Sequence, residues 1–412
     1  MKLNLDKDKK YILGCSSGPD SMCLFSLLLK EKCDFVVCNI DYNYRKNSIE
    51  ETELVREFCK QNNVLFFTKS VQHLNIFHNF EAWARDVRYD YFNEIGNKLG
   101  IENVLVAHNE DDLLETYLMQ KERKSLVTYY GLNRSYKRKN MIIYRPLLNY
   151  KKSDLLAYCK NNNVPYILDP TNSDTTYKRN YYRHLVVGKM SEKERDCLKK
   201  EIKDKNIELK KITDKVSKSI HLNTYFSKVD FMSLNDFESG ILLSKLINKN
   251  GFLFEVSLGL VKDLKNAISK NAKSYTLKIK DNIILTFDYD NISLINKDST
   301  YEFILNQSIL SNKLFTINKD SKYFGNIKNS PIFIIKPAKL ALNYKINNNL
   351  KKINRIFIDY KMPKFIRNIY PGIFNENGEL IYLPRYRKNF ILTKDSLLIF
   401  NLENLINLIE KK

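Results

Sequence analysis

The sequence predicts an α/β protein whose N-terminal part forms a doubly wound parallel sheet. Short runs rich in β-branched and aromatic residues alternate with helical patterns over residues 1–190. The spacing between successive runs leaves room for the helical crossovers that parallel strands require. Small and polar residues follow two of these runs, at the carboxyl ends of strands, where open parallel sheets bind ligands.

The expected elements of this part follow one another in regular order. Strands are expected at residues 11–15, 35–40, 65–68, 104–107 and 141–144. Helices are expected at residues 21–30, 50–62, 80–99, 111–120 and 153–161. The order predicts a Rossmann-like domain with its ligands at one edge of the sheet.

The rest of the chain predicts two further domains. Residues 191–220 are highly charged, with apolar residues at helical spacing, and predict a long connecting helix. Residues 230–272 are again helical in pattern, and residues 274–305 alternate apolar and polar side chains as hairpins do. A basic unit rich in β-type residues begins near Pro331. The expected domains are a catalytic domain at 1–190, a helical or α+β middle domain at 191–330 and a small basic C-terminal domain at 331–412.

Composition and charge restrict the partners and the compartment. The chain of 412 residues carries a formal charge of +21, and residues 311–412 hold 19 basic but only seven acidic side chains. This excess favours a nucleic-acid partner, although a lysine-rich composition bias is the alternative. The seven cysteines form no C-x-x-C pair and fit reduced thiols in a cytoplasmic protein. No signal peptide is recognisable, and no apolar run is long enough for a membrane span.

The first candidate site is the loop after the first expected strand. Its backbone N–H groups and hydroxyls could hold phosphate oxygens of ATP, yet no lysine follows the glycine as a Walker-type loop requires. An aspartate in this position would repel phosphate unless Mg²⁺ bridges the two. The alternative is an ordinary strand-to-helix turn capped by Ser or Asp. The candidate ATP-binding residues are Ser16, Ser17, Gly18, Pro19, Asp20 and Ser21.

The second candidate site is an acidic helix start after residues 104–107. Asp111 and Glu115 are spaced to share a helix face, and His108 lies at or before the cap. Asp112 could complete a magnesium site with Asp20. Simple capping by carboxylates is the alternative, and a joint site requires the two strand ends to be neighbours.

Several ordered motifs now point to a family. The loop resembles the pyrophosphate loop of the N-type ATP pyrophosphatases, and within that class the chain resembles the tRNA(Ile)-lysidine synthase family. The N-terminal resemblance covers nearly 190 residues, whereas the middle of the chain matches weakly. The matching segments are SSGPDS (16–21), DYNYRKNS (41–48), FEAWARDVRYDYF (80–92), AHNEDDLLET (107–116), RPLL (145–148), LDPTNSDTTYKRNYYR (168–183) and MPKFIRNIYPGIFNENGELIYLP (362–384).

The resemblance implies an enzyme that joins L-lysine to C2 of cytidine 34 in a tRNA(Ile) with a CAU anticodon. ATP would first adenylate the C2 oxygen with release of pyrophosphate, and lysine would then displace AMP to give lysidine, which changes decoding from AUG to AUA. The implied catalytic residues are Asp20, His108, Asp111 and Asp112, with Mg²⁺ held by Asp20 and Asp112. His108 is either a base or a cap that orients Asp111. The implied tRNA-binding residues are Arg85, Arg88, Arg179, Arg183, Lys364 and Arg367.

Some features depart from the family pattern or leave alternatives open. Tyr42 stands where a histidine is frequent, Leu113 where a glutamine is usual, and Ser17 where glycine is common. Residues 121–139 combine basic and tyrosine side chains and could bind an unpaired anticodon loop or form a solvated loop. The alternatives are another ATP-dependent tRNA-modifying or amide-forming enzyme of the superfamily, or a non-catalytic nucleotide- or RNA-binding module. The sequence does not fix the oligomeric state, and a homodimer is one of the alternatives.

Overall fold

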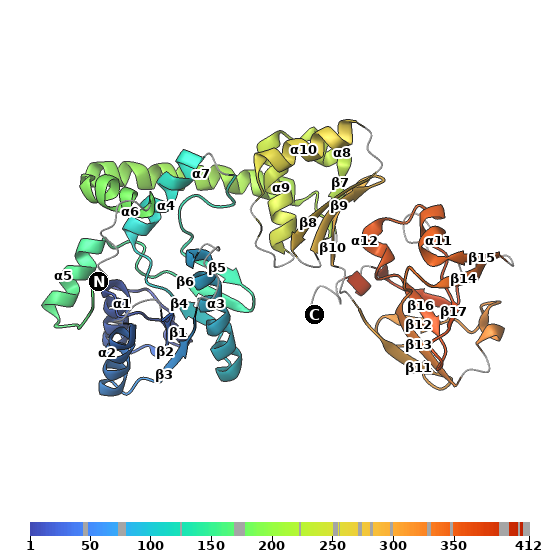
Figure 1. The fold of residues 1–412 in the computed structure, drawn as a ribbon, viewed down its shortest axis with the longest axis horizontal. Helices are drawn as coiled ribbons and strands as arrows, with labels where there is room; N and C mark the ends of the chain where they lie inside the picture. The colour runs from blue at the N-terminus through green and yellow to red at the C-terminus, as the bar shows by residue number, and fades with distance from the viewer. Residues whose placement is uncertain are drawn as a thin grey trace. The chain divides into compact units, whose positions relative to one another are not determined.

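The computed structural model of the chain divides into two compact units (Figure 1). The first unit is Met1–Leu209 and the second is Lys210–Lys412. The residues that the structure describes are 1–43, 48–72, 80–123, 126–168, 178–221, 224–249, 254, 256–270, 274–280, 283–296, 300–327, 331–346, 349–386, 395–402 and 404–406.

A six-stranded sheet forms the centre of the first unit. Its strand order is β3-β2-β1-β4-β6-β5, in which the first five strands are parallel and β5 runs antiparallel to β6. The doubly wound fold expected from the sequence is therefore confirmed, with one antiparallel edge strand added. The strands are β1 (Lys10–Gly14), β2 (Asp34–Asp41), β3 (Phe66–Ser70), β4 (Asn103–Leu105), β5 (Ser135–Arg138) and β6 (Met141–Tyr144).

Strand β5 lies inside the segment 121–139, where the sequence predicts a loop. It joins β6 through a two-residue turn in which Lys139 has a φ of 53°. The strand has four residues, two of them basic, and charged side chains are common on strands at the edge of a sheet. Its sequence therefore carries almost no hydrophobic signal.

Helices cover both faces of this sheet, and the sheet lies between two apolar cores. One core joins α1, α2 and α5 to residues such as Leu13 and Val37, and the other joins α3 to residues such as Ile12 and Val36. Alternate side chains of β1 and β2 therefore serve opposite layers, as the pleat of a strand requires. The helices are α1 (Pro19–Lys30), α2 (Ser48–Gln61), α3 (Phe80–Leu99), α4 (Glu110–Arg123), α5 (Lys152–Asn161), α6 (Lys178–Tyr181) and α7 (Glu192–Ser217).

The sheet reverses its winding direction between β1 and β4. The chain leaves β1 toward β2 and β3 on one side, and β4 lies on the other side with Leu13 opposite Leu105. The carboxyl ends of these two strands are therefore neighbours. Ligands bind at such a switch point in open α/β sheets, because the loops that follow the two strands diverge there. The two candidate loops of the sequence follow these two strands.

The second unit begins with the end of α7 and a four-stranded antiparallel sheet. Its strand order is β7-β10-β9-β8, and three helices lie between β7 and β8 in the sequence. The elements are β7 (Tyr225–Ser227), α8 (Lys228–Ser233), α9 (Asp236–Lys249), α10 (Leu258–Ser269), β8 (Ser274–Lys280), β9 (Ile283–Asp288) and β10 (Asn291–Asn296). The helical and hairpin patterns expected from the sequence are both present.

The last part of the chain is rich in short strands. A second four-stranded sheet has the order β11-β13-β16-β17, and β12 pairs with β18. The elements are β11 (Phe303–Asn306), β12 (Phe315–Ile317), β13 (Ile332–Pro337), β14 (Asn343–Ile346), β15 (Asn349–Lys352), α11 (Ile353–Asp359), α12 (Lys364–Arg367), β16 (Pro371–Phe374), β17 (Leu380–Tyr382) and β18 (Leu398–Phe400).

The contacts of the structure cross two of the expected domain borders. Strands β11 and β12 precede residue 331 but pair with β13 and β18, which follow it. The first compact unit ends at Leu209, so it contains residues 1–190 together with the first part of α7. Both features arise from long-range packing, which a local change in composition does not report. No helix in the described part of the chain combines the length and apolarity needed to cross a bilayer.

Candidate functional site

The loop between β1 and α1 is held in shape by its own serines. The Ser21 hydroxyl donates to the carbonyl oxygens of Ser16 and Gly18, and the Ser16 and Ser21 hydroxyl oxygens lie 3.1 Å apart. Gly18 is the N-cap of α1 and provides no side-chain cap, so the first amides of the helix keep their hydrogens available. Pro19 occupies the first helical turn and has no N–H to give. An uncapped helix N-terminus of this kind suits an anion.

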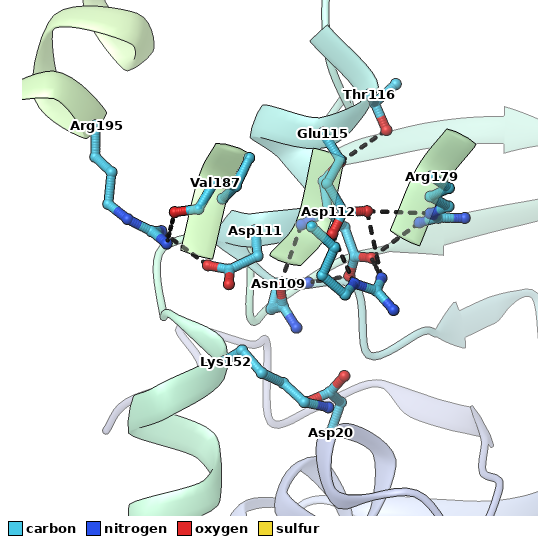
Figure 2. Close-up of polar contacts among 11 residues, drawn as sticks. Asp20, Asn109, Asp111, Asp112, Glu115, Thr116, Lys152, Arg179, Val187 and Arg195 are labelled. Carbon is cyan, nitrogen blue, oxygen red and sulfur yellow. Dashed lines mark hydrogen bonds and ion pairs between the residues drawn. The ribbon is translucent and has the colours of Figure 1, made fainter. Parts of the chain in front are cut away.

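Asp20, in the first turn of α1, pairs with a lysine that the sequence analysis did not single out. The Lys152 ammonium, at the start of α5, lies 2.7 Å from Asp20 Oδ1, and Figure 2 shows the two side chains facing each other. Burial raises the pKa of the Asp20 carboxyl, and the Lys152 charge works against this rise. A lysine therefore does reach this loop, but from a helix more than a hundred residues further along the chain.

Helix α4 begins with a reciprocal cap that involves Asp112. The Asp112 backbone N–H donates to Asn109 Oδ1 over 3.2 Å, and Asp112 Oδ2 accepts from the Asn109 N–H over 3.0 Å. Such reciprocal bonds satisfy two of the amides that a helix start leaves open. Asn109 is therefore the capping residue and His108 lies just before the cap, so the alternative in which His108 itself caps the helix is not observed.

Asp112 and Glu115 form a four-membered ion cluster with two arginines. Asp112 Oδ1 lies 2.9 Å from Arg179 and 3.0 Å from Arg183, and Glu115 accepts from the Nε atoms of Arg179 and Arg183 over 3.1 and 2.7 Å. The Glu115 side chain is fully buried, whereas the arginine side chains keep 39% and 29% of their surface exposed. The arginines of the cluster are therefore more exposed to solvent than its carboxylates.

The pKa values of the two carboxyls shift in opposite directions. Burial raises the pKa of both, but at Asp112 the nearby positive charges and the Asn109 amide outweigh burial and lower it. At Glu115 burial prevails over the two arginines, and the pKa is raised. Asp112 is thus firmly ionised near neutral pH.

Asp111 points to a different set of partners, although it lies next to Asp112. The Arg195 guanidinium of α7 donates to Asp111 over 2.8 Å, to Glu110 over 3.1 Å and to the Val187 carbonyl over 2.9 Å. Lys199 adds a second bond to Glu110 over 3.0 Å. Figure 2 shows Asp111 turned toward Arg195 and away from the Arg179 cluster. Asp111 and Glu115, whose spacing in the sequence predicts a shared helix face, therefore bind arginines from different helices.

His108 contacts an arginine of the RPLL segment. Arg145 Nε donates to His108 Nδ1 over 3.2 Å. Burial, together with the charges of Arg145, Arg179 and Arg85, lowers the pKa of the imidazole to about 3, against the opposing effect of Asp112. His108 is therefore neutral at physiological pH.

The two arginines of α3 lie against tyrosines. Arg85 stacks on the Tyr89 ring at 5.2 Å and approaches the Tyr136 hydroxyl, and Arg88 donates to the Tyr42 hydroxyl over 3.3 Å. Tyr42, the departure from the family's frequent histidine, therefore acts as a hydrogen-bond acceptor for Arg88.

Leu113, the second departure, has an apolar environment. It packs beside the cluster of Leu114, Tyr117, Val187 and Ile202, and a side chain added at Gly131 would lie 2.6 Å from it. An amide at this position would lie among apolar groups.

The two residues expected to bind tRNA in the second unit are used within that unit. Arg367 is 8% exposed, and its guanidinium donates to the Met362 carbonyl over 2.8 Å. The Lys364 backbone amide donates to Asp288, while its side chain remains accessible. The expectation of a phosphate contact at Arg367 is therefore corrected, because burial removes that guanidinium from the surface.

Parts of two motifs lie outside the described residues. They are Arg45 of the second motif, and Asp169, Asn172 and Asp174 of the 168–183 motif.

Four site residues were missed from sequence: Lys152, Glu115 as a partner of Asp112, Arg145 and Arg195. Arg145 and Glu115 stood inside quoted motifs, so their presence there was the available signal. Lys152 and Arg195 lie on ordinary charged helices and carry no local mark.

These features define the class of the protein: a nucleotide-binding α/β domain with a pyrophosphate-type loop at its switch point. Residues 1–190 match the family model described as a PP-loop domain. The U34-tRNA thiolase NcsA from Methanococcus maripaludis is a solved structure with 16% identity and a TM-score of 0.42, over 50% of this chain and 73% of that chain.

The chain as a whole belongs to the tRNA(Ile)-lysidine synthase family. It is 33% identical to the tRNA(Ile)-lysidine synthase of Mycoplasma mycoides subsp. mycoides SC, over 94% of this chain and 99% of the relative. The Mesoplasma florum relative is 31% identical over 88% and 94%, and the Staphylococcus epidermidis relative is 26% identical over 95% and 97% of the two chains. The chain is therefore an enzyme of the ligase class with an ATP-using PP-loop domain.

Proposed function

We propose that the chain ligates L-lysine to C2 of cytidine 34 in the CAU anticodon of tRNA(Ile). In this proposal the C2 oxygen attacks the α-phosphorus of ATP and pyrophosphate leaves, after which the lysine ε-amine attacks C2 and AMP leaves. The observation that carries the proposal is that the serine-rich loop and the acidic start of α4 follow neighbouring strands of one sheet edge. The choice of lysine, ATP and tRNA(Ile) as substrates follows from the family to which the chain belongs.

The residues of the loop between β1 and α1 are suited to bind pyrophosphate. Attack at the α-phosphorus makes pyrophosphate the leaving group, so the loop must bind the departing β- and γ-phosphates and not transfer them. The open amides of the first turn of α1 and the Ser16 and Ser17 positions would supply the donors. Pro19 contributes by fixing the start of the helix.

Of the carboxylates in this site, Asp20 suits Mg²⁺ best. Among the described residues no three His, Cys, Asp or Glu side chains are grouped to hold a metal ion. Magnesium usually binds one or two carboxylates together with phosphate oxygens. Asp20 fits this role, because none of the described residues bonds to its Oδ2, whereas both oxygens of Asp112 are already bonded. Asp20 would therefore hold Mg²⁺ with ATP, and the ion would supply charge neutralisation for the pyrophosphate.

The cluster of Asp112, Glu115, Arg179 and Arg183 suits a free amino acid. Lysine brings a carboxylate that guanidinium groups bind bidentately and an ammonium that carboxylates attract. A carboxylate beside the ε-ammonium could also accept the proton that an amine must lose before it attacks. We assign this role to Asp112 with Glu115, and we place Asp111 outside it, because Arg195 already holds Asp111.

The tRNA would contact both units. Arg85 and Arg88 lie exposed on α3, and Lys364 belongs to the basic C-terminal region. Arg179 and Arg183 face the ion cluster, so their proposed contact moves from the tRNA backbone to the lysine carboxylate. A tRNA substrate also implies a cytoplasmic location. The homodimer considered from sequence stays a prediction.

The decisive experiment combines ATP, labelled lysine and two transcripts, one of the isoleucine type and one of the methionine type, both with a CAU anticodon. We expect label to enter only the isoleucine-type transcript, with one AMP and one pyrophosphate released per lysine. Asp20→Ala is expected to reduce this incorporation below about a tenth of the parent rate, which is a barrier increase above about 1.4 kcal/mol.

The same mixture separates the alternatives. Label in neither transcript, together with ATP cleavage that depends on another nucleophile, would indicate a different acceptor. Binding of ATP and tRNA without any pyrophosphate release would indicate a non-catalytic module. Either result would overturn the proposal.

A further inference from the structure

The contact between Arg145 and His108 determines where the imidazole carries its proton. An arginine Nε is always protonated in proteins and can only donate. It lies 3.2 Å from His108 Nδ1 and donates to it, so Nδ1 presents a lone pair. A neutral imidazole with a free Nδ1 must carry its hydrogen on Nε2.

Arg145 is itself fixed, so this tautomer is fixed as well. Its side chain is buried, donates to the Asn133 carbonyl and stacks on the Tyr136 ring at 4.6 Å. Its backbone N–H donates to the Arg134 carbonyl over 2.9 Å. The guanidinium therefore has one orientation in which it meets His108.

The charges around His108 exclude its cationic form. Arg145 follows β6, Arg85 comes from α3 and Arg179 from α6, while Asp112 on α4 is the opposing carboxylate. Three cations against one anion disfavour a further positive charge. A protonated Nδ1 would also set two donors against each other at Arg145.

We propose that His108 donates a hydrogen bond through Nε2–H to an acceptor oxygen of the bound substrates, in a tautomer that Arg145 fixes. This inference rests on the proposed function and replaces the role of base considered from sequence. Within the part of the chain that the structure describes, no protein group bonds to Nε2. His108 follows β4, at the strand end beside the pyrophosphate-type loop. Arg145 is a positioning residue in this scheme.

Two substrate oxygens could accept this bond. One belongs to the phosphates of ATP, and the other is the C2 oxygen of the cytosine base. A fixed donor aimed at an oxygen whose charge grows during reaction typically accounts for about 10²- to 10³-fold in rate. A neutral donor does this without adding a proton-transfer step.

The tautomer can be observed directly in the unmodified protein. The chain has five histidines, so a long-range ¹⁵N–¹H correlation spectrum of histidine-labelled protein is simple, and the spectrum of His108→Gln assigns the missing signal. We expect Nδ1 unprotonated and Nε2 protonated, without change between about pH 5.5 and 8. A protonated Nδ1, or titration inside this range, would overturn the proposal.

Two amide substitutions at His108 test whether the donor must lie at the position of Nε2. The Gln amide nitrogen can occupy roughly the place of Nε2, whereas the shorter Asn amide reaches only the place of Nδ1. We expect His108→Gln to keep lysine transfer within about tenfold of the parent, and His108→Asn and His108→Leu to lose about 10²- to 10³-fold. Equal losses in the Gln and Asn variants would contradict the proposal.

Two further measurements, of ATP binding and of tRNA adenylation, identify the oxygen that accepts the hydrogen bond. Weaker binding of ATP alone to His108→Leu would identify a phosphate oxygen, and unchanged ATP binding with slower tRNA adenylation would identify the base oxygen. Unchanged ATP binding together with unchanged adenylation would overturn the proposal. If the parent protein transfers no lysine while the spectrum shows the expected tautomer, the proposed function fails and the tautomer assignment stands.

Discussion

The two carboxylate pairs at the start of α4 lie within six residues of each other and have different environments. Glu110 and Asp111 bind Arg195, whose side chain is 7% exposed. Asp112 and Glu115 bind Arg179 and Arg183, whose guanidinium groups remain partly open to solvent. One pair therefore joins two helices in the interior, and the other borders an accessible surface.

This difference shows that residue type and spacing do not decide the role of a carboxylate. A buried pair with all its partners in the protein has little capacity left for a ligand. A pair whose cations reach solvent can exchange those cations for a charged substrate. We therefore expect the Asp112 side of α4 to control the reaction and the Asp111 side to control stability.

The largest effect is expected from Asp112→Asn. The substitution removes the charge that balances Arg179 and Arg183, and lysine transfer should fall by about 10³-fold, which is about 4 kcal/mol in the barrier. Single-turnover transfer of labelled lysine measures this loss, and trapping of the adenylated tRNA shows whether the first step survives. Asp111→Asn is the matched control and should stay within about threefold, because Glu110 still binds Arg195. Similar losses in both variants would contradict the different roles expected for Asp112 and Asp111.

A smaller effect, on folding, is expected from Arg195→Met. The change leaves Glu110 and Asp111 without their buried cation and should lower the free energy of unfolding by about 3 kcal/mol. Trp83, the single tryptophan, lies in the first unit and reports its urea unfolding by fluorescence. Lys121→Met removes an exposed pair with Glu201 across the same two helices and should cost less than about 1 kcal/mol.

The Arg195 result can be separated from loss of packing. Adding Glu110→Gln and Asp111→Asn to Arg195→Met removes the unpaired charges and should recover part of the stability. If the triple variant is no more stable than Arg195→Met alone, the ion pairs are not the cause.

The smallest effect is expected in the pH dependence of stability. The folded-state pKa of Asp112 lies below its ordinary 3.8, so its contribution to stability is present above pH 3.8 and is lost as the pH falls through the folded pKa. The folded-state pKa of Glu115 lies above its ordinary 4.5, so stability decreases as the pH rises from 4.5 through that raised value.

Difference profiles isolate the two groups. Urea midpoints from Trp83 fluorescence, measured between about pH 3 and 7, should show that Asp112→Asn removes a loss on the acid side. Glu115→Gln should instead remove a decline above pH 4.5. Profiles that change in the same direction would show that the two carboxylates share one environment.

Much of the fold was predictable because the information is local. The β-branched runs and the apolar positions between them specified ten elements of the first unit, and the small residues after β1 marked the loop. Strand β5 was missed because four residues with two charges have no hydrophobic period. The start of the C-terminal sheet was missed because β11 and β12 join it by pairing with strands that follow later.

The sequence by itself determined where chemistry-bearing residues occur: a serine-rich loop with Asp20, and an acidic helix start after His108. The sequence left open whether these two places lie side by side, and the pairing of β1 with β4 decided that they end neighbouring strands. Only the tertiary structure decided the partners, since Arg183 lies 71 residues from Asp112, Arg195 lies 84 from Asp111, and Arg145 lies 37 from His108. Periodicity acts over a few residues, whereas an ion pair depends on which helices pack together, and that packing is a property of the whole core.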